Sequence, residues 1–125
     1  MTLLEELEPK LASFLNKRGL GVIEERRDDA FGNAMAVVKC DGFFVRVVRD
    51  RGDTSVEFCQ QGKDRWHLAE NILEFVTGSV PASLSDALET NFERVADLMN
   101  SDLKQRDYTA FEKTKADANM KRLFP

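Results

Sequence analysis

Hydrophobic residues recur every three or four positions from residue 2 to residue 18, which predicts an amphipathic helix. Thr2 and Glu5 have the spacing of a capping box, and Gly19 is placed to end the helix. Pro9 conflicts with a continuous helix because it has no amide proton and clashes with the preceding turn. Either the helix kinks at Pro9, or its ordered part starts there with Pro9 in the first position.

From residue 20 to residue 60 the pattern changes to short runs rich in β-branched and aromatic residues, which indicate β-strands. Strands are expected near residues 21–27, 33–40, 43–49 and 54–60. Asp41-Gly42 lies between the second and third runs and favours a tight hairpin, because a type I′ turn needs positive φ at both positions. The four runs together predict an antiparallel meander.

The loop around Arg51-Gly52 fixes how the last two predicted strands pair. A loop of two or four residues sets Val45 opposite Phe58 and Arg46 opposite Glu57, whereas a loop of three would oppose Val45 to Glu57. The even loop is expected because it joins apolar to apolar and unlike charges to each other. One face of the sheet then collects small and apolar residues: Ala34, Ala36, Val38, Cys40, Phe43, Val45, Val47, Val56 and Phe58.

The opposite face of the predicted sheet is mixed. It carries apolar and polar side chains together: Met35, Val37, Phe44, Val48, Asn33, Lys39, Arg46 and Glu57. We expect this face to be either partly covered or available to a partner, because exposed apolar groups of this kind mark interaction sites. The candidate partner-binding residues are three on this face and four at the charged tip of the hairpin: Phe44, Arg46 and Glu57, with Arg49, Asp50, Arg51 and Asp53.

Two or three helices are expected after residue 60. Asp64 is placed to cap a helix that contains His67 in its first turn and ends at Gly78. Its apolar stripe is Ala69, Ile72, Leu73 and Val76. Ser83 or Ser85 then opens a longer helix, and Asn100-Ser101-Asp102 predicts either a bend or the start of a separate last helix.

This order of elements predicts an α+β fold, with an N-terminal helix, a four-stranded antiparallel meander and C-terminal helices packed on one sheet face. The chain of 125 residues is expected to form one domain, residues 1–125, because a single core commonly serves about 100–150 residues. Residues 119–125 are expected to fray at the end of the chain.

Composition and charge exclude several classes of function. Hydrophobic residues make up 42% of the chain and charged residues 32%, which is typical of a globular protein. The net charge of −4 is spread evenly, without the basic patch that a nucleic-acid partner requires. A membrane partner is not expected, because no apolar run approaches the roughly 18–20 residues that cross a bilayer. The N-terminus lacks the pattern of a secretory signal, so a cytoplasmic location is expected.

Few residues suggest catalysis, and no catalytic, cofactor-binding or metal-binding residue is assigned. Cys40 and Cys59 fall on opposite faces of the predicted sheet, so they are not expected to form a disulfide. His67 is the only histidine, and a structural role is expected for it. One alternative stays open: an enzyme or small-ligand binder with a pocket between helices and sheet, built from Cys59, His67 and Trp66.

Arg51-Gly52-Asp53 has the sequence that adhesion ligands present to integrins. Such a tripeptide also arises by chance, and Gly and Asp are residues that tight turns select. An adhesion ligand must be extracellular, which the expected cytoplasmic location contradicts. The tripeptide is therefore interpreted as a hairpin turn.

Three stretches resemble small bacterial proteins, some of which are thought to act as immunity proteins beside polymorphic toxins. They are Phe31-Gly32-Asn33-Ala34, the pair of strands FFVRVVRDRGDTSVEF, and the pattern Trp66, Leu68, Ile72-Leu73. The resemblance covers about residues 31–76 and assigns no functional residue. It implies a non-enzymatic role in binding a protein, such as a cognate toxin whose active site it would block.

Small acidic α+β proteins of this length also resemble type III secretion chaperones, which implies a homodimer with the long C-terminal helix as a contact surface. The predicted topology departs from those chaperones, because the strands here cluster before the last helices instead of alternating with them. A dimeric adaptor of this kind is the second alternative to an immunity-type protein.

Overall fold

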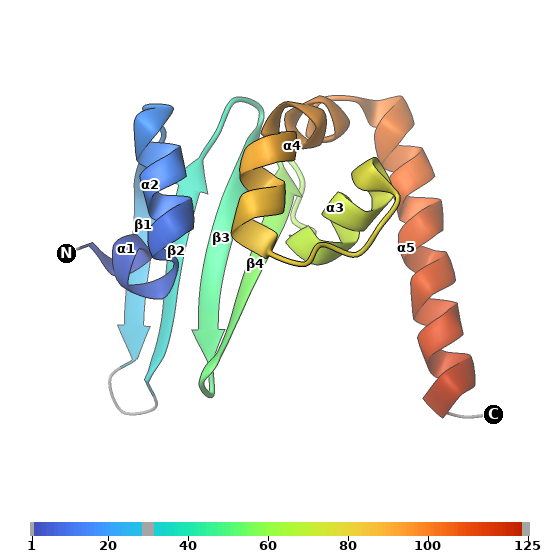
Figure 1. Ribbon diagram of the computed structural model, residues 1–125, viewed down its shortest axis with the longest axis horizontal. Coiled ribbons are helices and arrows are strands. Elements are labelled where there is room, and N and C mark those ends of the chain that lie inside the picture. The colour runs from blue at the N-terminus through green and yellow to red at the C-terminus, as the bar shows by residue number, and fades with distance from the viewer. Residues whose placement is uncertain (1, 29–31, 124–125) are drawn as a thin grey trace.

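The computed structural model describes residues 2–28 and 32–123 (Figure 1). Phe31, one of the residues that carry the resemblance above, lies outside these ranges. Within them, the elements in chain order are α1 (Leu3–Leu7), α2 (Pro9–Lys17), β1 (Gly21–Asp28), β2 (Asn33–Lys39), β3 (Phe43–Asp50), β4 (Asp53–Gln60), β5 (His67–Leu68), α3 (Ala69–Thr77), α4 (Leu84–Met99) and α5 (Asp102–Leu123).

The N-terminal segment forms two helices instead of one. Thr2 caps α1, with its hydroxyl oxygen accepting a hydrogen bond from the Glu5 amide at 3.2 Å. Pro9 is the first residue of α2, where the missing amide proton leaves no bond unmade. Gly19 follows α2 with φ of 74°, as expected for the residue that ends it. The chain therefore bends at Pro9, and both helices bury leucines.

The sheet is an antiparallel meander with the strand order β1-β2-β3-β4-β5. The prediction of four strands was one short. Residues 67–68 pair with β4 where the first turn of a helix was expected, and Leu68 instead of Asp64 is the N-cap of α3. Trp66 and Leu68 are larger apolar residues on either side of His67, a short alternation that suits the edge of a sheet.

The predicted register of the β3–β4 hairpin is confirmed. Val45 pairs with Phe58 and Arg46 with Glu57. Asp50 pairs with Asp53, which leaves a loop of two residues, Arg51 and Gly52. Their φ angles of 54° and 86° are both positive, as a type I′ turn requires. The tripeptide Arg51-Gly52-Asp53 is thus the tip of a tight hairpin.

The β2–β3 turn differs from the type I′ turn that Asp41-Gly42 predicts. Gly42 has φ of 85°, but Arg51 is the one non-glycine residue with positive φ in the described chain, so Asp41 does not share that conformation. A tertiary contact explains the difference: the Asn100 side chain donates to the Asp41 carbonyl oxygen at 3.1 Å. A Cβ atom on Gly42 would lie 1.8 Å from Asn100 Oδ1. The predicted strand register is nevertheless kept, with Val38 opposite Val45.

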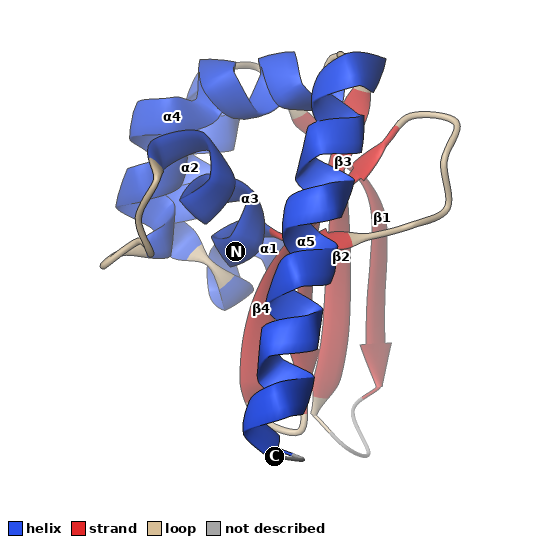
Figure 2. Ribbon diagram, turned by 90° about the vertical axis from the view of Figure 1, so that its right-hand side faces the viewer, coloured by secondary structure: helices blue, strands red, loops and turns tan. Residues whose placement is uncertain are grey.

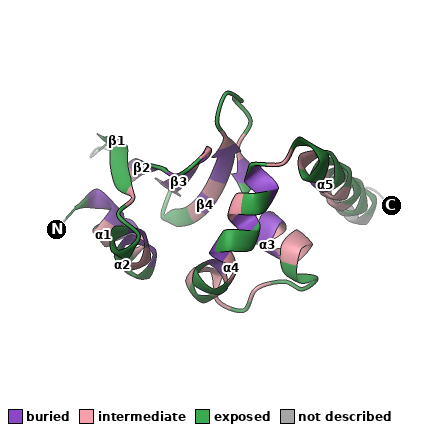
Figure 3. Ribbon diagram, turned by 90° about the horizontal axis from the view of Figure 1, so that it is seen from above, coloured by how far each residue is buried: buried purple, intermediate pink, exposed green. Residues whose placement is uncertain are grey.

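Helices α1 to α4 lie on one face of the sheet, which we call the inner face (Figure 3). All nine small and apolar residues predicted for that face are buried. Phe43 of β3 packs against Phe92 of α4, with 5.8 Å between the ring centroids and the rings tilted by 44°. Ser83 is the N-cap of α4, one of the two predicted starts, with its hydroxyl oxygen facing the Asp86 amide at 3.5 Å. The core thus lies between this face and the helices.

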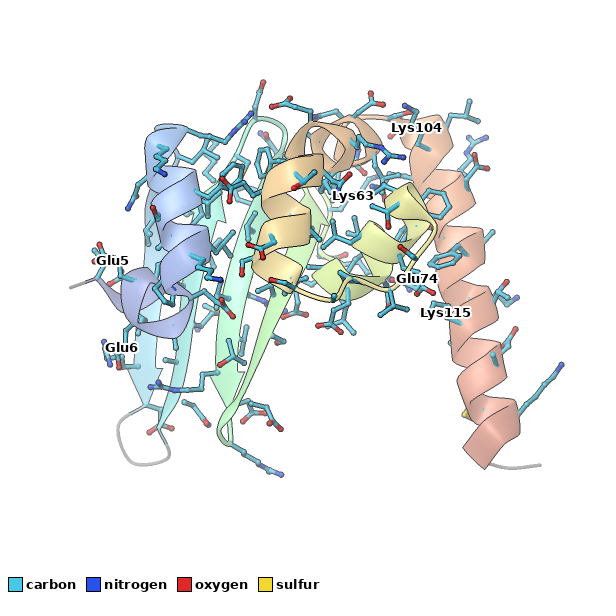
Figure 4. All side chains as sticks on the ribbon, viewed as in Figure 1. Glu5, Glu6, Lys63, Glu74, Lys104 and Lys115 are labelled. Carbon is cyan, nitrogen blue, oxygen red and sulfur yellow. The ribbon has the colours of Figure 1, made fainter. Side chains whose placement is uncertain are left out.

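Helix α5 is a separate last helix, as one of the two interpretations of residues 100–102 requires. It lies beyond the edge of the sheet that β4 and β5 form, beside α3, instead of covering a face (Figures 1 and 2). Tyr108 is fully buried and its ring packs at 5.6 Å from that of Phe75 on α3. Lys115 on α5 reaches Glu74 on α3 in an ion pair (Figure 4).

Beyond Lys115 the helix projects away from the body and continues to Leu123; of the stretch 119–125 that was expected to fray, residues 124 and 125 lie outside the described residues. In the described part of the chain, no helix combines the length and apolar character needed to span a membrane.

Candidate protein-binding face

The sheet face opposite α1 to α4, which we call the outer face, carries no helix in the described chain (Figure 3). Strand alternation places a mixed set of side chains on it: Met35, Val37, Phe44, Arg46, Val48, Glu57, Cys59, Trp66 and Leu68. Val37 and Cys59 are buried by their neighbours, Leu68 is 40% exposed, and the others of this set are half-buried. The face therefore presents a partly solvated apolar surface around the Arg46–Glu57 pair, with the exposed Lys39 and the Glu24–Arg26 ion pair toward its β1 side.

Arg46 and Glu57 form the centre of the outer face. The Nε and Nη2 atoms of Arg46 donate to Glu57 Oε1 at 3.2 and 3.0 Å across strands β3 and β4. The guanidinium carbon lies 4.1 Å from the centroid of the Trp66 ring, a cation–π contact. Side-chain exposures of 25% for Arg46 and 18% for Glu57 show that this cluster is largely shielded. Arg46 is thus held in one orientation by a carboxylate and a ring.

The tip of the hairpin divides its four candidate residues. Asp50 and Asp53 pair with each other and share the outer side with Arg46. Arg49 points to the inner side, where its Nε donates to the Gly32 carbonyl oxygen at 2.8 Å and its Nη1 lies 3.9 Å from Glu6 of α1. The contact that Arg51 makes is through its backbone amide, which donates to Asn33 Oδ1 at 3.0 Å. The outer face thus brings together five of the seven candidates: Phe44, Arg46, Glu57, Asp50 and Asp53.

Trp66 and Leu68 belong to the outer face, although the sequence placed them in the first turn of a helix. The missed signal is the order apolar, His67, apolar directly before the helical stripe that begins at Ala69. Leu68 pairs with Glu57 and therefore points to the same side as Arg46.

The residues of the alternative enzymatic site are not brought together. Cys59 is on the outer side of the sheet, whereas His67 pairs with the inner residue Phe58. The Cys59 thiol donates to the Lys63 carbonyl oxygen at 3.2 Å, and burial raises its pKa although Arg46 opposes the shift. Burial also raises the pKa of Cys40 to about 12. Both thiols are free, on opposite faces, and held in their neutral form.

His67 instead joins α5 through a second polar cluster. Its Nδ1 lies 2.8 Å from Glu112 Oε2, which also accepts a hydrogen bond from the Tyr108 hydroxyl at 3.0 Å. Arg65 forms an ion pair with the other oxygen of Glu112.

The environment of Glu112 acts on its pKa in two directions. Burial raises the pKa of the carboxyl, but the bonds from His67 and Tyr108 and the charges of His67 and Arg65 outweigh it, so the pKa is lowered. The pKa of Tyr108 is raised by burial and by the charge of Glu112. Glu112 is therefore an anion that receives several donors at the contact between β5 and α5.

Comparison with known proteins returned no match to a family model, a curated protein or a solved structure. In the described residues, no group of three or more His, Cys, Asp or Glu side chains is arranged to hold a metal ion.

Proposed function

We propose that this protein is a non-enzymatic binding module that docks a protein partner on the outer face of its sheet. The observation that carries the proposal is Arg46 stacked on Trp66 and bonded to Glu57 in the middle of a partly apolar face that no helix of the described residues covers. Trp and Arg are the residue types that most often dominate the binding energy of protein interfaces.

The arrangement of Arg46 supports this function energetically. Binding normally costs free energy because long side chains lose rotamers, and Arg is among the residues with most rotamers to lose. Here Glu57 and Trp66 already restrict Arg46 before any partner arrives. The guanidinium retains donors that Glu57 does not use, so a partner carboxylate or carbonyl group would find it oriented. Phe44, Met35 and Val48 provide apolar area around this anchor.

Within this class, the resemblance favours an immunity protein of a bacterial toxin system, acting in the cytoplasm. Such a protein would cover the active site of its toxin and would need no catalytic residue of its own. The separation of Cys59 from His67 and the raised pKa of both thiols fit a role without nucleophilic catalysis.

The experiment is to express the product of the adjacent coding sequence, with and without this protein, in a host that lacks both. We expect the neighbour to arrest growth when expressed alone and the wild-type chain to restore growth. The double variant Phe44→Ala/Trp66→Ala should no longer restore growth, because it removes the apolar Phe44 side chain and the Trp66 ring that packs against Arg46. Val80→Ala is the matched control, since Val80 is 70% exposed in the connection before α4 and distant in sequence from the outer face.

A harmless neighbour would contradict the immunity function. Full protection by the Phe44→Ala/Trp66→Ala chain, confirmed as folded by circular dichroism, would contradict the outer face as the docking surface. Sedimentation of the purified protein addresses the homodimer: if the outer face joins two copies, the double variant should be monomeric while the Val80→Ala chain stays dimeric.

A further inference from the structure

A polar cleft of about 620 Å³ lies between the residues that join β4 to β5 and the first half of α5. His67 is its most buried lining residue, and Lys63, Asp64 and Arg65 contribute from the connection. Asp102 and Arg106 contribute from α5, at the four-residue spacing that places both on one side of a helix. Lys63 lies in the upper part of the molecule, as does Lys104 at the start of α5 (Figure 4). The cleft shares no residue with the set that defines the outer face.

His67 offers this cleft one free ring nitrogen. The side chain is 8% exposed, and its Nδ1 is occupied by Glu112 Oε2 at 2.8 Å. Because Glu112 is an acceptor, Nδ1 carries the proton and the orientation of the ring is fixed, as for histidines that carboxylates hold in place. Nε2 has no hydrogen-bond partner in the described chain. Every fully enclosed side-chain nitrogen or oxygen atom of the described residues does have such a partner. Nε2 therefore reaches solvent, and the cleft is the space that His67 lines.

Two basic side chains of the cleft, Lys63 and Arg106, have no ion-pair partner within the described residues and can receive an anion. Three basic side chains line the cleft against two acidic ones. Arg65 is already paired with Glu112. Of the acidic pair, Asp102 faces the Gln60 amide at 3.5 Å and stands in the first turn of α5, where its charge stabilises the helix.

We propose that this cleft binds an oxyanion, either a carboxylate or a phosphate group, with Lys63 and Arg106 as its donors beside His67. Carboxylates and phosphates share the geometry that a guanidinium receives with two parallel hydrogen bonds, and an ammonium adds a point charge. The cleft is distinct from the outer face, so the test of anion binding does not depend on the proposed function.

The test uses the fact that His67 is the only histidine of the chain. In protein labelled with ¹⁵N-histidine, the two ring nitrogens give signals that belong to one residue. Inorganic phosphate and, separately, glutamate are titrated at constant ionic strength set with chloride. We expect a saturable shift that is larger at Nε2 than at Nδ1, and the tighter of the two anions identifies the class of ligand.

Arg106→Gln and Lys63→Gln should each weaken the titration about fivefold or more, because each removes one charged donor from an exposed position. Lys113→Gln is the matched control: it removes an exposed lysine from α5 outside the cleft and should leave the titration unchanged. Chemical shifts that change linearly with concentration for both anions, without saturation, would overturn the proposal. So would a saturable shift that both cleft variants retain at wild-type strength.

Discussion

Replacing Glu112 with glutamine should destabilise the protein by about 2–3 kcal/mol, because hydrogen bonds to a charged group contribute about 1.5–3 kcal/mol each. Glu112 is 17% exposed and accepts from His67 and Tyr108 while pairing with Arg65. Glutamine keeps the shape but loses the charge, and its NH₂ group must face one of these donors. At about 4 °C per kcal/mol for a domain of this size, the midpoint of thermal unfolding should fall by about 10 °C.

The effect of Glu112 should depend on pH in a defined direction. The folded protein lowers the pKa of this carboxyl, so its contribution is complete above the unfolded pKa of about 4.3 and is lost as the pH falls through the lower folded value. The difference in stability between wild type and Glu112→Gln should therefore be constant near neutral pH and shrink in acid.

The assay is urea unfolding followed by circular dichroism at several pH values. Glu93→Gln serves as the control: Glu93 also pairs with an arginine, Arg18, but its side chain is 76% exposed, and it should cost less than about 1 kcal/mol. A Glu112→Gln protein within about 0.5 kcal/mol of wild type at pH 7 would refute the claim that this cluster fastens α5 to β5.

Three further outcomes test the turns and the thiols. Arg51→Asn should stabilise the protein by about 0.5–1 kcal/mol in urea unfolding, because Asn tolerates the positive φ of 54° better than Arg; a loss of stability would contradict the turn assignment. Gly42→Ala should cost at least about 1 kcal/mol, since φ is 85° and its Cβ would meet Asn100; an unfolding midpoint equal to wild type would exclude that contact. Cys40 and Cys59 should react with iodoacetamide far more slowly in the native protein than in urea, because burial raises the pKa of both thiols; equal rates would show that they are accessible.

The register of the central hairpin could be predicted because alternation leaves few choices. Once Val45 must face Phe58, a shift by one residue would bury Glu57, so the loop length follows. Local spacing likewise predicted Ser83 as a helix start and Gly78 as a helix end, and φ of 83° at Gly78 confirms the latter.

Features that depend on contacts distant in sequence could not be predicted. The Asp41-Gly42 turn takes its form from Asn100, which reaches it from the end of α4. Residues 67–68 form β5 because β4 provides a free edge and Glu112 provides a partner for His67, and both lie outside any local window. For the same reason the sequence paired Arg46 with Glu57 but did not place Trp66 over Arg46. The sequence also grouped Arg49 with candidate residues that lie on the outer face, whereas the Arg49 side chain lies on the inner side.

The most direct test of the binding proposal is calorimetric titration of the purified partner, identified by the co-expression experiment, into wild type and Trp66→Ala. If Arg46 on Trp66 anchors the interface, Trp66→Ala should raise Kd about thirtyfold or more, corresponding to a loss of about 2 kcal/mol, while Val80→Ala leaves Kd unchanged. A Trp66→Ala protein that is folded and binds the partner with the wild-type Kd would contradict the outer face as the docking surface.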